Sequence, residues 1–284
     1  MKRIGFALAV LVLLAAGCGD DGDDDVADDT TTTSPSTTAP ATTTTAPAGG
    51  EADVRVYFAW NEHVGTAGRT VEAPAVARGA LTELLAGPDA FETDIGMTTE
   101  IPEGTELLGV DIADGEATVD LSGEFQSGGG SLSMQLRVAE VVFTLTQFDT
   151  VESVSFALDG EEVGSIGGEG IDATDVTRAD LTNVTPFILV ESPVPGETVT
   201  SPLEVTGIAN TFEANVQYSM TDGDGLIVDE GFTTATAGNG TWGDFAFTTT
   251  FEVPRPGLGA IIVFQESAED GSQTDVYEVP VRVG

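Results

Sequence analysis

The pattern of hydrophobic and polar residues changes several times along this chain of 284 residues. An apolar run fills residues 4–16, and a polar, low-complexity stretch follows to residue 50. Between residues 51 and 183, segments with the period of a strand alternate with segments with the period of a helix. From residue 187 the helical period disappears and only short β-rich runs remain. The pattern therefore predicts a leader, a linker and two folded domains.

Residues 51–183 are predicted to form strands and helices in alternation. A helix is expected from Pro74 to about Ala86, because proline is favoured at the start of a helix and Gly87-Pro88 ends it. Ser131 is the expected N-cap of a second helix that continues to about Gln147. This order predicts an α+β domain with the helices on one face of a small sheet. The expected strands are 54–58, 107–112, 117–121 and 151–158, with tight turns at Asp114-Gly115 and Asp159-Gly160 and a last helical turn capped by Asp175 or Thr177.

Residues 187–284 are predicted to form an all-β, immunoglobulin-like sandwich. Seven short β-rich runs with turn residues between them are typical of that fold. The chain has one cysteine, so no disulfide can join the two sheets and the domain depends on buried apolar side chains. The expected strands are 187–191, 203–208, 216–220, 226–232, 242–253, 260–266 and 276–283. The aromatic residues expected in its core are Trp242, Phe245, Phe247, Phe251 and Phe264.

Residues 1–17 have the layout of a lipoprotein signal peptide. Lys2 and Arg3 precede the apolar run, which is about 20 Å long as a helix and too short for a bilayer core of about 30 Å. Small residues lead to Cys18, and a cleavage site that ends in cysteine resembles the bacterial lipobox, in which the thiol is acylated. An ordinary signal peptide with a chance cysteine is the alternative. We expect a lipid on Cys18 and a location on the extracytoplasmic face of the bacterial cell membrane.

The composition of the linker and of the whole chain narrows the choice of partners. Residues 18–50 hold an acidic block and a tract of Thr, Ala and Pro, which bury too little apolar surface to fold and are predicted to be a disordered tether. The net charge of the chain is −39, from 48 acidic residues and nine Lys and Arg. Such a surface repels nucleic acid and anionic lipid headgroups. We therefore expect no nucleic-acid partner and a membrane contact only through the lipid on Cys18.

No stretch carries a convincing catalytic, cofactor or metal signature. Asp222-Gly223-Asp224-Gly225 begins like a calcium loop, but apolar residues occupy the next ligand positions, so a hairpin turn is expected. His63 is the only histidine and lies in a Gly-rich connector, which predicts a solvated loop residue rather than part of a triad. A carboxylate pair for glycoside hydrolysis stays open, although among 48 acidic residues such a pair arises by chance. We expect no catalytic residue, no cofactor and no bound metal.

Several segments of the first predicted domain carry a family resemblance. They are residues 83–88, 99–105, 109–110, 117–122, 124–125, 128–131 and 142–148. Together they resemble the GerMN (sporulation and spore germination) domain, over nearly the whole predicted domain and in the same order. Members of that family are envelope lipoproteins or spore-envelope proteins, with a fold similar to the ring-building motifs of sporulation channel proteins. The resemblance implies a role in assembly and supplies no catalytic residue.

A second motif opens the predicted sandwich. It consists of Ile188, Val190, Ser192-Pro193, Gly196, Val199, Pro202-Leu203, Val205, Gly207, Ala209-Asn210 and Phe212-Glu213-Ala214. This spacing resembles the immunoglobulin-like domain of bacterial spore-germination and related envelope proteins. In that family the domain accompanies GerMN, and the resemblance implies a unit for binding or spacing.

The sequence therefore predicts a non-enzymatic, lipid-anchored protein of the cell envelope. It is expected to act through association with another envelope protein or with itself. The alternative is a lipoprotein that binds cell-wall glycan or peptide, which its location and the aromatic residues of the sandwich favour. A hydrolase with a carboxylate pair is a third hypothesis.

Overall fold

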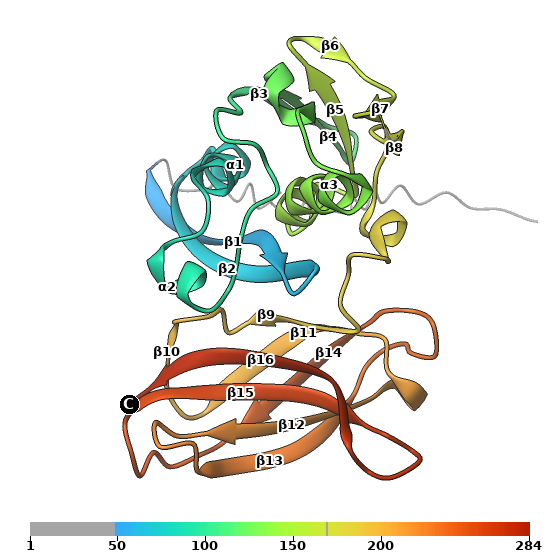
Figure 1. Ribbon diagram of the computed structural model, residues 1–284. Helices are drawn as coiled ribbons and strands as arrows, with labels where there is room; N and C mark the ends of the chain where they lie inside the picture. Colours follow the sequence, from blue (N-terminus) through green and yellow to red (C-terminus); the bar gives the residue numbers. More distant parts are fainter. Residues whose placement is uncertain (1–48, 169) are drawn as a thin grey trace, which may run out of the picture. The chain divides into compact units, whose positions relative to one another are not determined.

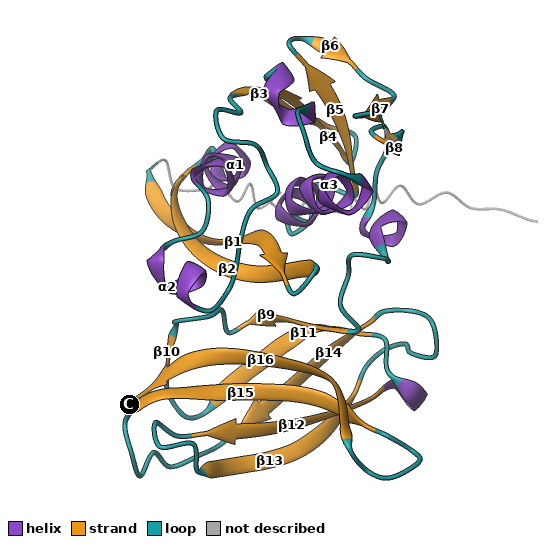
Figure 2. Ribbon diagram, viewed as in Figure 1, coloured by secondary structure: helices purple, strands orange, loops and turns teal. Residues whose placement is uncertain are grey.

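The structure is a computed structural model that describes residues 49–168 and 170–284, so the predicted signal peptide, Cys18 and nearly all of the expected linker lie outside the described residues. A mixed α+β module (residues 50–181) precedes an all-β module (residues 188–283), as Figures 1 and 2 show. This arrangement confirms the predicted fold class. Within the described residues, no helix is both long enough and apolar enough to cross a membrane.

The α+β module begins with a long hairpin. β1 (Gly50–Trp60) and β2 (His63–Ala73) pair antiparallel along their whole length. The two turn residues, Asn61 and Glu62, both have positive φ, which suits a two-residue hairpin. β2 was not expected, because its glycines and alanines hide the alternation that marks a strand. The prediction that His63 lies in a loop is therefore wrong, since His63 is the first residue of β2 and is half-buried.

Two helices pack on this hairpin. α1 (Val76–Ala86) buries Ala80, Leu81 and Leu84, and α3 (Ser131–Leu145) is buried on nearly all sides from Met134 onward. α3 contacts the hairpin on one side and a second sheet on the other, which explains its lack of a polar face. Gly130 is the N-cap of α3, so the prediction that Ser131 is the N-cap is one residue off. An unexpected short helix, α2 (Ala90–Asp94), begins with a capping box.

The second sheet of the α+β module has the order β3-β4-β5-β6. Its strands are β3 (Leu107–Ala113), β4 (Glu116–Leu121), β5 (Ser153–Leu158) and β6 (Glu161–Glu162). β4 and β5 are parallel, and α3 lies between them in the chain. Both predicted tight turns are confirmed, with positive φ at Asp114-Gly115 and Asp159-Gly160. The remaining elements are η1 (Gly123–Gln126), β7 (Ser165–Ile166), β8 (Ile171–Asp172) and η2 (Arg178–Leu181), which Thr177 caps as predicted.

The all-β module consists of two sheets, of the orders β14-β11-β9 and β10-β16-β15-β12-β13. Its elements are β9 (Ile188–Ser192), β10 (Thr198–Val199), β11 (Leu203–Ala209), η3 (Phe212–Ala214), β12 (Asn215–Thr221), β13 (Ile227–Thr234), β14 (Gly243–Thr249), β15 (Gly257–Glu266) and β16 (Gln273–Val283). All seven predicted strands are present, and β10 is additional. Of the aromatic residues expected in the core, Phe245, Phe251 and Phe264 are buried. Phe247 and Trp242 are half-buried. Trp242 precedes β14, and its ring stacks on the exposed ring of Phe187.

One continuous cluster of buried apolar side chains includes residues of both modules. Val56 and Phe143 contribute from the α+β module, and Val190 and Val279 contribute from the all-β module. Four successive residues of β1, from Val56 to Ala59, are buried, which requires that both faces of the hairpin are covered. The helices cover one face, and β9 contacts the hairpin from the all-β module. The hairpin is therefore the layer through which the two modules are joined.

Candidate functional site at the module boundary

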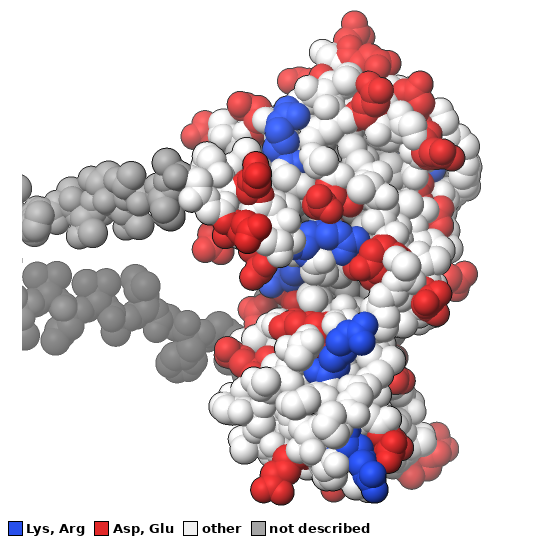
Figure 3. Space-filling view, turned by 90° about the vertical axis from the view of Figure 1, so that its left-hand side faces the viewer, with Lys and Arg blue, Asp and Glu red and all other residues white. Residues whose placement is uncertain are grey.

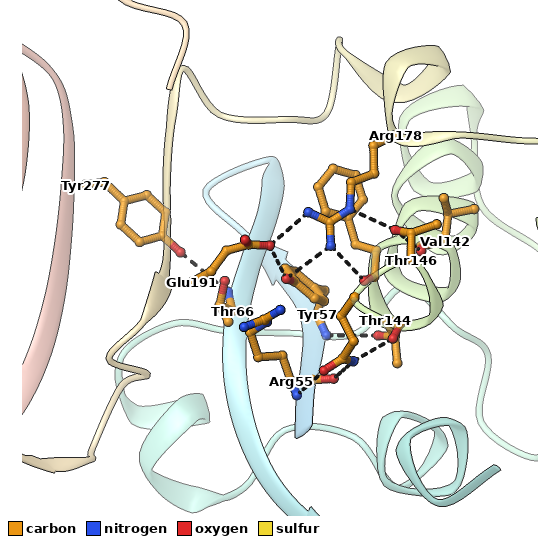
Figure 4. Close-up of polar contacts among 11 residues, drawn as sticks. Arg55, Tyr57, Thr66, Val142, Thr144, Thr146, Arg178, Glu191 and Tyr277 are labelled. Atoms are coloured by element: carbon orange, nitrogen blue, oxygen red, sulfur yellow. Dashed lines mark hydrogen bonds and ion pairs between the residues drawn. The ribbon is translucent and has the colours of Figure 1, made fainter. Parts of the chain in front are cut away.

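A polar network, buried at Tyr57 and half-buried at Arg178 and Glu191, joins the two modules (Figure 4). Tyr57 comes from β1, Arg178 from η2 and Glu191 from β9. The Tyr57 hydroxyl donates a hydrogen bond to the Glu191 carboxylate, and Arg178 Nη1 donates to the same carboxylate oxygen at 2.8 Å. Arg178 Nη2 lies 3.4 Å from the Tyr57 hydroxyl, so the three side chains form a closed triangle. Residues 134 positions apart in the chain are thereby held in contact.

The guanidinium of Arg178 is fixed from the α+β side as well. Its Nε donates to Thr146 Oγ1 at 2.8 Å, and its Nη2 donates to the carbonyl oxygen of Phe143 at 3.2 Å. The guanidinium carbon lies 4.6 Å from the centroid of the Phe143 ring and 5.4 Å from that of Tyr57. Such stacking suits arginine, whose planar cation is weakly hydrated. Arg178 thus links the end of α3 to β9.

The protonation states of the three groups are fixed near neutral pH. Burial alone would raise the pKa of Glu191, but the guanidinium of Arg178 and the hydrogen bond from Tyr57 hold it below its usual value. Burial, reinforced by the Glu191 carboxylate, raises the pKa of the Tyr57 hydroxyl well above its usual value. Burial would lower the pKa of Arg178, but Tyr57 and Glu191 keep it raised. None of the three groups changes its protonation state near neutral pH, which a general acid or base must do.

The two modules also approach each other closely beside this network. Gly68 of β2 faces Val194, and a Cβ added at Gly68 would lie 2.7 Å from Val194 Cγ2. Gly196 has a φ of +80°, and a Cβ there would lie 3.0 Å from the ring of Phe91 in α2. The hydroxyl of Tyr277 accepts a hydrogen bond from the backbone N–H of Thr66 at 3.4 Å. Both glycines therefore permit a backbone approach that a side chain would block.

A cleft of about 860 Å³ opens beside this network and is lined by both modules. Arg55, Gln147 and Phe148 line it from the α+β module, and Val194 and Pro195 line it from the all-β module. Acidic side chains are scattered over both modules in the view of Figure 3, and the few basic side chains lie among them at several separate places. The lining of the cleft includes two arginines, Arg55 and Arg69, together with five acidic residues, namely Asp53, Asp89, Glu92, Glu191 and Glu197.

Two of the arginines in and beside the cleft differ in their partners. Arg69 donates to both carboxylate oxygens of Glu92, at 2.5 Å and 2.8 Å, and lies 3.6 Å from a carboxylate oxygen of Glu83. Arg55, by contrast, has a buried Nε with no hydrogen-bond acceptor among the described residues. The guanidinium of Arg69 is therefore paired within the fold, whereas Arg55 has an N–H donor that no group of the fold accepts.

Two further cavities lie elsewhere in the described part of the chain. One, of about 740 Å³, is lined by the aromatic residues Trp60, Phe187 and Tyr277 and by His63. His63 Nδ1 lies 2.8 Å from the carbonyl oxygen of Asn61, which sets its ring within the hairpin turn. The other cavity, of about 570 Å³, lies at the start of α3 and includes Glu100 and Ser133 in its lining.

The sequence-predicted site residues have different outcomes. Cys18 lies outside the described residues, so its lipidation stays a prediction. The acidic loop is a tight turn between β12 and β13, as expected, because a carboxylate oxygen of Asp222 accepts hydrogen bonds from the backbone N–H groups of Asp224 and Leu226, each at 3.0 Å. Within residues 49–168 and 170–284, no group of three or more His, Cys, Asp or Glu side chains could hold a metal ion.

Sequence reasoning missed the boundary network. Tyr57 lies in a predicted strand, Arg178 in a predicted helical turn and Glu191 at the end of a predicted strand, but no spacing connects them. One weak signal was present, because Arg178 is one of only nine basic residues in the chain. A rare basic residue in an acidic chain can pair with many different carboxylates, so the composition of the chain does not show which of them it contacts.

Comparison with known families matches each module to a different model. Residues 55–164 match the family described as "Sporulation and spore germination". Residues 187–272 match the "Immunoglobulin-like domain of bacterial spore germination". Neither family is a known catalytic one. A search of curated proteins gave no match.

Solved structures with some similarity cover different parts of the chain. The first GerMN domain of the sporulation protein GerM from Bacillus subtilis is 27% identical with a TM-score of 0.37, and the match covers 45% of this chain and 98% of that one. A candidate lipoprotein from Clostridium perfringens is 20% identical with a TM-score of 0.35, covering 48% and 93%. The tandem GerMN domains of GerM are 18% identical with a TM-score of 0.38, covering 82% and 61%.

Proposed function

Because the chain carries a GerMN domain followed by an immunoglobulin-like domain of bacterial spore germination, we propose that it is a non-enzymatic, lipid-anchored cell-envelope protein. It acts by association with another envelope protein or with a second copy of itself. Its lipid is carried by Cys18, which the sequence around the predicted cleavage site supports. The two modules act as one binding unit rather than as two independent domains.

The observation that carries this proposal is the polar network of Tyr57, Arg178 and Glu191. Its polar groups bond to one another across the module boundary, and their shifted pKa values keep their charges constant near neutral pH. A site built for proton transfer has the opposite design, with a group whose pKa lies near the working pH. The boundary therefore supports a structural role that presents a fixed composite surface to a partner.

In-cell crosslinking tests the association. Lys2 is the only lysine and lies in the predicted signal peptide, so amine-reactive reagents are unsuitable for the mature chain. A photoreactive amino acid is introduced instead at Phe232, which is 66% exposed on β13, and, as a second site, at Phe212, which is 63% exposed. Adducts are captured and identified by mass spectrometry. The Cys18→Ser chain, which we expect to be released from the membrane, is the control.

One dominant protein adduct, or a self-adduct, that disappears in the Cys18→Ser control is the expected result. Adducts that carry only wall fragments would transfer support to the alternative, a lipoprotein that binds cell-wall glycan or peptide. A failure to detect any adduct above the control at either site would refute the association.

The aromatic cavity favours that alternative function. Trp60 and Tyr277 pack edge to face with centroids 5.3 Å apart, and the neighbouring Phe187 is 53% exposed. Flat apolar rings beside polar groups suit a ligand that has both apolar and hydrogen-bonding surfaces, as sugars do. Retention of the Cys18→Ser chain on purified cell wall, reduced by Phe187→Ala, is the outcome that this alternative predicts.

A further inference from the structure

We propose that the cleft beside the module boundary contains a carboxylate-binding subsite centred on Arg55, and that it takes the carboxylate of a peptide. This inference deepens the proposed function and rests on it only in so far as the partner supplies the peptide.

The fold fixes Arg55 on the face of β1 that is turned toward the all-β module. Its cross-strand neighbour is Gly68, which has no side chain to cover the guanidinium. Gln147 clamps the Arg55 backbone, since its Oε1 accepts from the Arg55 N–H at 2.7 Å and its Nε2 donates to the Arg55 carbonyl at 2.5 Å. Figure 4 shows the Arg55 side chain beneath Glu191 without a hydrogen bond to it. The side chain is thus placed in advance of any ligand.

The missing partner is an anion. The Nε of Arg55 is buried and has no acceptor among the described residues. A buried donor left unpaired is unfavourable, and a guanidinium pairs best with a carboxylate, which matches its donors two at a time. Glu191 accepts no hydrogen bond from Arg55, because its Oε1 is bonded to Tyr57 and Arg178, and Arg55 acts on this carboxylate only through its charge. Two guanidinium groups therefore face one carboxylate.

The other acidic groups of the cleft have partners of their own. Asp53 accepts from Thr70 Oγ1 at 2.8 Å, Glu197 accepts from the N–H of Val194 at 3.0 Å, and Glu92 is paired with Arg69. They leave Arg55 without a partner, yet they repel a ligand of high negative charge. The subsite therefore suits one carboxylate on an otherwise neutral chain. Phe148, Val194 and Pro195 line the same cleft and offer apolar contact to the rest of a short peptide.

The test uses the full mature chain with Cys18→Ser, which removes the lipid. The probe is N-acetyl-Ala-Ala with a free carboxylate, titrated by calorimetry and by NMR. N-acetyl-Ala-Ala amide removes the charge, N-acetyl-Glu-Ala amide moves it to a side chain, and tripolyphosphate tests a polyanion. We expect the free carboxylate to bind and both the amide and tripolyphosphate to fail. Binding of the Glu peptide would support the same subsite with a side chain as the source.

Matched variants assign the binding to Arg55. Arg55→Gln should weaken binding of the carboxylate probe by about tenfold or more, since a charge-assisted hydrogen bond is lost. Arg78→Gln makes the same change on the exposed surface of α1 and should leave binding unchanged. No binding by any carboxylate probe at millimolar concentration, or binding that Arg55→Gln leaves intact, overturns the proposal.

A stability measurement separates a ligand-binding role from a structural one. Because the Arg55 side chain has no hydrogen-bonded partner among the described residues, Arg55→Met should leave the thermal midpoint of the unliganded chain unchanged or raise it. A midpoint lowered by many degrees would mean that the guanidinium serves Glu191 inside the fold, and the proposal would fail. Either failure leaves the crosslinking result untouched, so the proposed association is judged separately.

Discussion

Replacement of Glu140 by glutamine is expected to stabilise the protein increasingly as the pH rises. Glu140 lies in α3 and is fully buried. Its carboxyl oxygens accept from Thr99 Oγ1 at 2.6 Å and from the N–H of Glu100 at 2.8 Å, and no arginine or histidine among the described residues forms an ion pair with it. Burial raises its pKa from 4.5 to about 8, against the effect of these hydrogen bonds. The carboxyl group is therefore neutral in the folded protein near pH 7.

The magnitude follows from the difference between the folded and unfolded pKa values. Below about pH 4 the group is protonated in both states and costs nothing. As the pH rises, the unfolded state gains from ionisation first, so stability falls and the full cost is reached above about pH 8. Each pKa unit corresponds to about 1.4 kcal/mol, which gives a cost of about 3 kcal/mol near pH 7 and a limit of about 5 kcal/mol. The amide oxygen of glutamine can still accept from the N–H of Glu100, and its NH₂ group can donate to the Thr99 hydroxyl, which accepts as readily as it donates, without this cost.

The assay is urea unfolding of Glu140→Gln and of the unchanged chain, both in the Cys18→Ser background, across the range from about pH 4 to pH 9. The two should have similar free energies of unfolding at the acid end and diverge steadily above about pH 5. Glu103→Gln is the matched control, because Glu103 is exposed and should give no pH-dependent difference. A gain that is constant with pH, or a loss at every pH, would show that Glu140 does not titrate as argued.

The remaining predictions concern the module boundary and the aromatic cavity. Arg178→Met and Glu191→Gln should each cost about 2–3 kcal/mol in urea unfolding, because each leaves a half-buried charge without its partner, and the double variant should cost less than their sum. Gly196→Ala should lower the thermal midpoint by several degrees, from strain at positive φ and contact with Phe91 together costing about 1–3 kcal/mol, and an unchanged midpoint would contradict the close approach. Phe187→Ala should change stability by less than about 1 kcal/mol, since the ring is largely exposed, so any loss of wall retention reports on binding.

Local patterns were enough to predict most of the elements. α3 and the strands of the all-β module have clear periods and turn residues, and the structure confirms them. The sequence did not predict β2, because glycines have a low strand propensity and those of β2 are there to allow close packing against Trp60 and Val194. Glu140 shows the same limit, since a glutamate inside a helix usually faces solvent. Its burial depends on the loop at Thr99, which is distant in sequence, and no periodicity reports such a contact.

The boundary network was beyond sequence reasoning for a related reason. Its three side chains come from a strand, a helical turn and a strand that belong to different modules. Each is unremarkable in its local context, and only the docking of one module on the other makes them partners. The family resemblances supplied the two folds, but neither of them describes how the two modules meet.

The position of β1 has a mechanical consequence. If Cys18 carries the proposed lipid, a pulling force enters the folded part of the chain at Gly50, the first residue of β1. Seven residues further along the same strand, Tyr57 is bonded to Glu191 of the other module. Tension would therefore reach the boundary through a single strand that is clamped by its hairpin partner. Under such a load, the contact between the two modules would bear force early, so the proposed anchor and the module boundary would be mechanically coupled.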